Sequence, residues 1–301
     1  MKITNRMNLP EAMVKAVSVR RHNNPGRLSA TTLLNGTKQI LLTDRHWDDL
    51  EDDVADRFWA IIGTAVHSVL EDEGKDDFTE EFVSHDTDGI TVTGRIDNYN
   101  MRTGVISDYK SVSVWKIKFQ NFDDWRKQGM IYAWLLKKNG FEVKTCRFIA
   151  LIKDHSKRDA KRDLSYPQKP MYVYEFAVTE EGLAEIEAFI KERVALYNQC
   201  RDKVDDDIPP CSADERWEKP TKYAVKKEGR KTAVRVFDTL EEAEKMAADL
   251  GKGHSVEIRA GESTRCLEYC SCCEFCNFYR DNVAANIAGI DGQDINWPSK
   301  E

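Results

Sequence analysis

The stretch GRIDNYNMRTGVISDYKS, residues 94–111, constrains this chain most, because it places two aspartates and a lysine around one tight turn with little that could be buried. Alternating apolar and polar residues on both sides of NMRTG predict an antiparallel hairpin. If Asn100 faces Val105, the same register places Asp97 directly opposite Asp108. Lys110 then lies on the same face, because side chains alternate along a strand.

Two carboxylates opposed in this way repel each other, so the hairpin favours a cation between them. A hard divalent ion such as Mg²⁺ binds a few carboxylate oxygens and keeps water in its shell. Such an ion acidifies a water and stabilises charge on a phosphoryl oxygen, and a lysine positions the water or offsets the developing charge. Phosphodiester hydrolysis would use all three groups. A bare D-x-K pattern, taken alone, more often marks a surface hairpin that carries an ion pair.

Two further pairs of residues accompany the hairpin. His67 lies on a predicted helix, and Gly63 stands one turn before it on the same face, where it would allow close approach of a ligand. A neutral imidazole is a ready metal ligand. Gln128 and Tyr132 share one face of a later helix and could contact DNA or support the lysine.

Hydrophobic periodicity predicts an α/β core in which a central sheet is flanked by helices. The predicted helices are Asp53–Glu73, Asp123–Lys138 and a long amphipathic helix capped by Thr179; the predicted strands include EFVSH and the two hairpin strands, then residues 146–152 and 171–178. The sequence pattern changes after DDDIPP, which predicts two domains, residues 1–205 and residues 206–301. The second domain is a small α+β module, with a hairpin, a helix between Thr239 and Gly251, and a strand HSVEIR.

Composition narrows the classes of function. Among 301 residues with a net charge of −7, no apolar run approaches the roughly 20 residues of a membrane span, and the N-terminus lacks the apolar core of a signal peptide. We therefore predict a soluble, cytoplasmic protein with no membrane partner. The net charge argues against bulk coating of nucleic acid, although residues 216–235 and 153–169 are rich in Lys and Arg.

Five of the eight cysteines lie within residues 266–276. Structural disulfides are rare in the cytosol, and clustered thiolates suit zinc or an iron–sulfur cluster. A catalytic cysteine is the weaker interpretation, because no histidine lies nearby in the sequence.

Taken in order, G-x-x-x-H, G-x-x-D, D-x-K and Q-x-x-x-Y resemble the RecB-type branch of the PD-(D/E)XK nuclease superfamily over about residues 26–200, with RLSATTLL resembling its opening serine-led segment. The first acidic residue follows Gly-Arg-Ile instead of proline. The resemblance implies a mixed central sheet and Mg²⁺ or Mn²⁺ at the site. It also implies roles: metal ligation by His67, Asp97, Asp108 and the Tyr109 carbonyl, catalysis by Lys110, and support by the helix pair Gln128 and Tyr132.

The same resemblance implies a four-cysteine [4Fe-4S] staple, formed here by Cys211, Cys266, Cys270 and Cys276, with Cys273 as a substitute ligand. In stapled relatives the distant cysteine precedes the core, whereas this chain has no cysteine before Cys146. Zn²⁺ therefore stays an alternative.

The favoured function is a metal-dependent DNA nuclease, with exonuclease as the favoured mode, in phage-type recombination. Its expected partners are DNA and a single-strand annealing protein. The alternative is a catalytically silent DNA-binding or scaffold subunit. A zinc-ribbon regulator would explain the cysteines and leave residues 63–132 unexplained.

Overall fold

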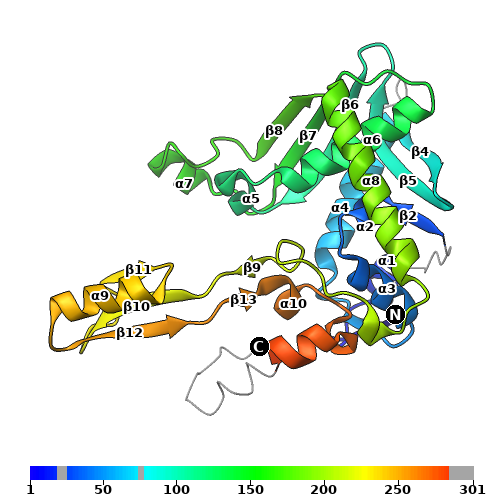
Figure 1. The fold of residues 1–301 in the computed structure, drawn as a ribbon. Coiled ribbons are helices and arrows are strands. Elements are labelled where there is room, and N and C mark those ends of the chain that lie inside the picture. The colour runs from blue at the N-terminus through cyan, green and yellow to red at the C-terminus, as the bar shows by residue number, and fades with distance from the viewer. Residues whose placement is uncertain (19–25, 74–77, 285–301) are drawn as a thin grey trace. The chain divides into compact units, whose positions relative to one another are not determined.

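The computed structural model describes residues 1–18, 26–73 and 78–284, and within them a mixed six-stranded sheet forms the centre of the larger unit (Figure 1). The strand order is β2-β5-β6-β7-β8, with β4 pairing the other edge of β5. Pairs β2–β5 and β6–β7 are parallel, and the remaining pairs are antiparallel. The strands are β2 (Arg27–Ser29), β4 (Phe78–Thr87), β5 (Ile90–Asn100), β6 (Val105–Val112), β7 (Thr145–Ile152) and β8 (Met171–Ala177).

Three long helices flank this sheet. Helix α6 (Asp123–Lys138) has the predicted bounds and packs against strands β4 to β7. Helix α8 (Glu180–Cys200) packs on α6, and its predicted cap is confirmed, because the Thr179 hydroxyl accepts a hydrogen bond from the Gly182 N–H. Helix α4 (Phe58–Glu73) contacts β5 and β6. The predicted arrangement of a mixed sheet flanked by helices is confirmed.

The helix predicted to begin at Asp53 begins five residues later. Asp53 instead ends β3 (Glu51–Asp53), which pairs in parallel with β1 (Lys2–Thr4). Its carboxylate accepts hydrogen bonds from the N–H groups of Arg6 and Ala55. Those bonds hold the pKa of Asp53 below its usual range and fix an extended segment that periodicity alone reads as helix.

Several short elements lie outside the sequence prediction, because runs of four to nine residues show too little periodicity to be recognised. They are the helices α1 (Glu11–Val17), α3 (Thr37–Arg45), α5 (Val114–Phe119) and α7 (Lys157–Arg162). Helix α2 (Ala30–Leu33) lies in the RLSATTLL segment, where the resemblance implies a serine-led helix, and the Ser29 hydroxyl caps it by accepting from the Thr32 N–H. Helix α5 follows directly after the strand that carries Asp108 and Lys110.

Backbone contacts group the chain into two units, Met1–Ile40 with Trp47–Lys203, and Leu41–His46 with Val204–Glu301. The contact-based grouping places residues 41–46 with the C-terminal part. The division at residue 205 stays a prediction.

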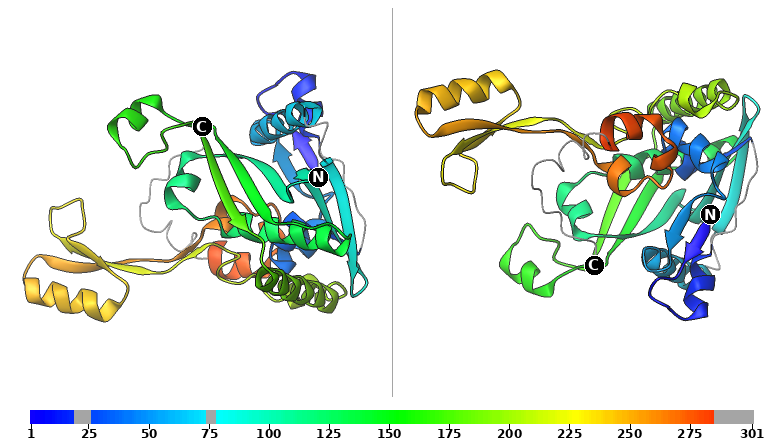
Figure 2. Two further views of the ribbon diagram at one scale, coloured as in Figure 1. Left: turned by 90° about the horizontal axis from the view of Figure 1, so that it is seen from above. Right: turned by 90° about the horizontal axis from the view of Figure 1, so that it is seen from below.

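The second unit carries the predicted α+β module. Strands β10 (Lys222–Lys227) and β11 (Arg235–Phe237) form the predicted hairpin, and β12 (His254–Arg259) pairs with the other edge of β10. Helix α9 (Leu240–Leu250) has the predicted Thr239 cap and Gly251 end. The module lies at the end of two extended segments of the chain that run side by side (Figure 2). The remaining elements are β9 (Glu218–Lys219), β13 (Glu262–Ser263), α10 (Thr264–Glu268), the 3-10 turns η1 (Asp205–Asp207) and η2 (Cys273–Phe275), and the π-helical turn η3 (Tyr279–Ala284).

Across the described ranges, none of the helices combines the length and apolarity that crossing a bilayer requires.

Two helical glycines should respond oppositely to alanine. A Cβ at Gly129 would meet ring carbons of Phe148 and Phe176 at 3.0 Å, whereas a Cβ at Gly63 would meet nothing within 4 Å. We expect Gly129→Ala to destabilise the protein by about 1–3 kcal/mol through overpacking. Gly63→Ala should stabilise it by up to about 1 kcal/mol through helix propensity. Urea unfolding of both variants measures this, and a Gly129→Ala protein as stable as wild type would contradict the packing described.

Candidate active site

The β5–β6 hairpin has the predicted register over three pairs, from Asn100↔Val105 to Asn98↔Ser107. Regular pairing ends there, one residue before the two aspartates. In place of the next backbone bond, an Asp97 carboxylate oxygen accepts from the Tyr109 N–H at 2.9 Å. Along its whole length, from Val105 to Val112, β6 pairs in parallel with β7, and Asp108 stands beside Phe148 in that register. Asp97 therefore lies outside the regular β5–β6 backbone pairing, at the position where the two carboxylates come together.

Asp108 is the most buried group of the site. It is 1% exposed, and its Oδ1 lies 2.6 Å from Lys110 Nζ. Its Oδ2 accepts from Gln128 Nε2 at 3.3 Å. Oδ1 is buried without a correctly directed hydrogen bond. Burial raises the pKa of Asp108 to about 6, and Asp97 adds to the rise, while the Lys110 ammonium limits it.

Gln128 and Tyr132, predicted to share a helix face, do so on α6 and hydrogen-bond to each other at 2.8 Å. Both side chains are buried. Gly94, at the start of the predicted G-x-x-D pattern, explains how α6 comes so close: a Cβ there would lie 2.9 Å from carbons of Tyr132 and Leu135. The glycine therefore lets α6 bring its amide to Asp108.

His67, on α4, reaches the same site from another element. Its Nδ1 lies 3.4 Å from Asp97 Oδ1, and its ring meets the Tyr109 ring edge-on, with centroids 6.4 Å apart. The side chain is 32% exposed, whereas that of Asp97 is 11% exposed. The structure thus brings together His67, Asp97, Asp108, Lys110, Gln128 and Tyr132, all predicted from the sequence. Their roles stay predictions.

Over residues 1–18, 26–73 and 78–284, no group of three or more His, Cys, Asp or Glu side chains is arranged to hold a metal ion. The donor chemistry at the hairpin nevertheless fits a hard cation. Two carboxylates and an imidazole meet there, and Asp108 Oδ1 is buried with an incomplete hydrogen-bond shell.

The clustered cysteines approach one another in the second unit. Burial, together with the nearby Cys270, Cys211 and Cys276, raises the pKa of the Cys266 thiol to about 12. The Sγ atoms of Cys270 and Cys272 are 3.6 Å apart. These effects indicate that the four predicted thiols lie near one another, although within residues 1–18, 26–73 and 78–284 no three of them are arranged to hold a metal ion.

Cys272, outside the predicted set, is fully buried and hydrogen-bonds with Thr43 and Cys270. Those bonds lower the pKa of Cys272, whereas Cys276 and Cys211 act to raise it. Burial raises the pKa of Cys273, the predicted substitute, to about 11, and its strongest charged neighbours are Cys270 and Glu274. Cys272 therefore interacts with three of the four predicted ligands, Cys270, Cys276 and Cys211, whereas Cys273 interacts chiefly with Cys270. The sequence signal for this was present in the C-x3-C spacing from Cys272 to Cys276.

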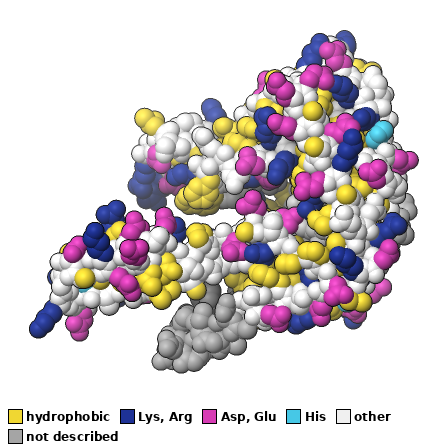
Figure 3. All heavy atoms as spheres, viewed as in Figure 1, with side chains coloured by type: hydrophobic (Ala, Val, Ile, Leu, Met, Phe, Trp, Pro, Cys, Tyr) yellow, Lys and Arg dark blue, Asp and Glu magenta, His cyan; other side chains and the backbone are white. Residues whose placement is uncertain are grey.

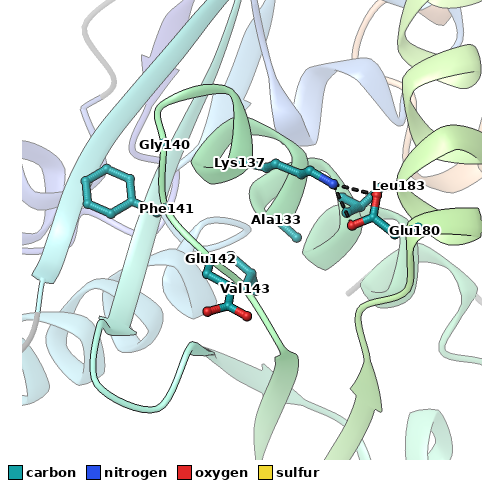
Figure 4. Close-up of a pocket in the computed structure, with 8 residues that line it drawn as sticks. All are labelled: Ala133, Lys137, Gly140, Phe141, Glu142, Val143, Glu180 and Leu183. Carbon is teal, nitrogen blue, oxygen red and sulfur yellow. Dashed lines mark hydrogen bonds and ion pairs between the residues drawn. The ribbon is translucent and has the colours of Figure 1, made fainter.

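A cavity of about 320 Å³ lies elsewhere in the first unit, between the end of α6 and the start of α8. Its wall includes the ion pair of Lys137 with Glu180, at 2.6 Å, and the residues Ala133, Gly140, Phe141, Glu142, Val143 and Leu183 (Figure 4). None of the predicted site residues lines it, so the candidate site lies apart from this cavity.

No family model and no curated protein matches this chain. Among solved structures, it is similar to SSO0001, with 15% identity, a TM-score of 0.44, and coverage of 62% of this chain and 83% of that one. It is also similar to the alkaline exonuclease LHK-Exo from Laribacter hongkongensis, with 14% identity, a TM-score of 0.38, and coverage of 58% of this chain and 89% of that one. A third similar structure is a phage related exonuclease from Haemophilus somnus, with 12% identity, a TM-score of 0.37, and coverage of 57% of this chain and 94% of that one. TM-scores below 0.5 are too low to support an argument about function, so the proposal below depends on the site itself.

The buried carboxylate gives a pH prediction for metal-free protein. The folded pKa of Asp108, about 6, lies above the value near 3.9 of an unfolded chain, so the ionised form destabilises the fold. The penalty is absent below about pH 4, grows between about pH 4 and pH 6 as the unfolded chain ionises while folded Asp108 keeps its proton, and is constant above that range, where both states are ionised. Asp108→Asn should therefore be more stable than wild type by about 1–3 kcal/mol at pH 8, and by much less at pH 4.

Urea unfolding of wild type and Asp108→Asn in EDTA at the two pH values tests this. Asp86, an exposed aspartate on β4 that accepts from the Thr91 hydroxyl, supplies the matched Asp86→Asn control. A stability difference between wild type and Asp108→Asn that does not change with pH would contradict the burial argument.

Proposed function

We propose that this chain is a divalent-metal-dependent nuclease that hydrolyses DNA phosphodiester bonds, with a RecB-type PD-(D/E)XK core. The observation that carries the proposal is the surroundings of Asp108. A carboxylate that is 1% exposed sits beside a second carboxylate and a lysine, with Oδ1 lacking a directed hydrogen bond. A protein that only scaffolds has no physical reason to keep so unfavourable a group.

Each side chain has a role in this proposal. Asp97, Asp108 and His67 would hold Mg²⁺ or Mn²⁺, with the Tyr109 carbonyl as a further oxygen donor. When bound, such an ion lowers the pKa of a coordinated water and stabilises charge on the phosphate. Lys110, whose Nζ is 2.6 Å from Asp108, would position the attacking water and offset charge on the phosphate. Gln128 and Tyr132 would fix the Asp108 carboxylate from behind.

Exonuclease action is the favoured mode, and the setting would be phage-type recombination in a bacterial or phage-infected cell. DNA is then the substrate, and a single-strand annealing protein the proposed partner. Residues 1–205 would be the nuclease domain and residues 206–301 an accessory module.

The cleavage test uses end-labelled linear DNA, single- and double-stranded, with Mg²⁺ or EDTA. Wild type should cut only with metal. Asp97→Asn and Asp108→Asn should abolish cleavage, because each removes a charged metal ligand, and Lys110→Ala should slow it by about 10²-fold or more.

Asp86→Asn should cut at the wild-type rate. The position of the label in the products gives the polarity. A folded wild-type protein that binds DNA and cuts none of it with either metal would overturn the nuclease proposal in favour of a catalytically silent DNA-binding subunit.

The cysteines would form a second, structural centre that holds a [4Fe-4S] cluster or Zn²⁺. The effects of Cys211, Cys270 and Cys276 on the pKa of Cys266 support that ligand set, and Cys272 is better placed than Cys273 as a substitute. Bound metal would join the two ends of the segment from residue 211 to residue 276 and stabilise the second unit.

Elemental analysis of the purified protein distinguishes iron from zinc and tests the ligands. We expect Cys211→Ser and Cys276→Ser to lose most of the metal and to lower Tm, and Cys272→Ser to lose more metal than Cys273→Ser. Cys146→Ser is the control, since Cys146 is buried in β7 of the other unit. A full metal complement in Cys211→Ser would contradict the proposed centre.

A further inference from the structure

An exposed aromatic pair lies just beyond the strand that carries Asp108 and Lys110. Trp115 and Phe119 share one face of α5, and their ring centroids are 5.7 Å apart in a stacked arrangement. The two side chains are 55% and 72% exposed. Large aromatic side chains normally bury most of their area, so a stacked pair left open to solvent indicates a binding surface.

The position of this pair is fixed relative to the candidate site. The Asp154 carboxylate, just after β7, accepts from both the Ser113 hydroxyl at 2.6 Å and the Val114 N–H at 2.7 Å. These two bonds fasten the start of α5 to the end of the neighbouring strand. The aromatic pair is thus held by the same two strands that hold Asp108 and Lys110.

Lysines connect the site to the pair. Phe148 and Trp125 form a buried stack, with centroids 5.6 Å apart. Lys110 Nζ lies 5.7 Å from the Phe148 centroid and Lys116 Nζ lies 5.3 Å from the Trp125 centroid. The two ammonium groups therefore lie along one continuous aromatic stack.

Two further lysines, Lys118 and Lys153, also lie over aromatic rings. Lys118 Nζ lies 5.2 Å from the Trp115 centroid. Lys153, whose N–H donates to the Val112 carbonyl at the end of β6, holds its Nζ 3.8 Å from the ring of Trp59, which is 48% exposed. Acidic side chains are also present: Lys116 pairs with Asp124 at 2.7 Å and Lys118 with Asp163 at 3.7 Å. The lysine side chains of these pairs are 25% and 27% exposed and the carboxylates 55% and 46%, so both pairs are partly exposed, and such a pair can yield to a phosphate.

We propose that Trp115 and Phe119, with Lys116 and Lys118, bind an unpaired nucleic-acid strand next to the cleavage site, with bases stacked on the rings and phosphates along the lysines. The inference rests on the proposed function, because its occupant is the strand cleaved at Asp97 and Asp108. Aromatic rings interleaved with lysines suit a single strand, since base faces are available for stacking only when the bases are not stacked within a duplex. Figure 3 shows Lys and Arg interspersed with Asp and Glu over the face in view, so this face carries no continuous positive surface.

Base stacking can be measured separately from phosphate attraction. The test compares a fluorescein-labelled dT20 strand with an abasic strand of the same length and charge, by anisotropy in EDTA, where no cleavage occurs. Wild type should bind dT20 about tenfold more tightly than the abasic strand. Trp115→Leu with Phe119→Leu, which keeps apolar bulk and removes the rings, should bind both strands equally, with its affinity for the abasic strand unchanged.

Phe82→Ala is the matched control. Phe82 is also exposed and has a cation over its ring, the Arg27 guanidinium at 4.4 Å, but it lies on edge strand β4. This variant should keep the tenfold preference. Equal binding of the two strands by wild type, or a preference that survives in the double leucine variant, would overturn the inference and leave a protein partner as the occupant of the aromatic pair. Because the readout is binding in EDTA, it is independent of whether the chain cleaves DNA.

Discussion

The candidate site depends on one unfavourable interaction, the placement of two carboxylates at the point where β5 and β6 stop pairing. Asp108 is buried beside Asp97, and burial raises its pKa to about 6. The surrounding structure offsets this cost with the Lys110 ammonium, the Gln128 amide and the Tyr109 N–H. Helix α6 must approach the sheet closely to supply the amide, which is why position 94 has no side chain.

Much of this arrangement could be predicted from the sequence, because it follows from local rules. The register from Asn100 and Val105 is set by the turn, and the period of two then assigns the face of Asp108 and Lys110. The bounds of α6 and the caps at Thr179 and Thr239 follow from helix propensities and capping chemistry. These features need no knowledge of distant contacts.

The features that escaped prediction depend on distant partners or short segments. Asp53 ends a strand instead of beginning a helix, because Thr4 and Arg6 reach it from the N-terminus. Cys272 hydrogen-bonds with Thr43, which lies more than two hundred residues earlier in the sequence, so its position depends in part on a distant contact. Helix α5 is too short for a periodic signal, so the exposure of Trp115 and Phe119 became visible only in three dimensions.

The central claim is that the hairpin carboxylates share a divalent cation. Anomalous diffraction from crystals soaked in Mn²⁺, with data collected at the manganese edge, tests it most directly. The account predicts a single strong peak between Asp97 and Asp108, about 2.1 Å from an oxygen of each and within reach of the His67 ring. Crystals in which Mn²⁺ binds only at other positions, with Lys110 still paired to Asp108, would contradict it.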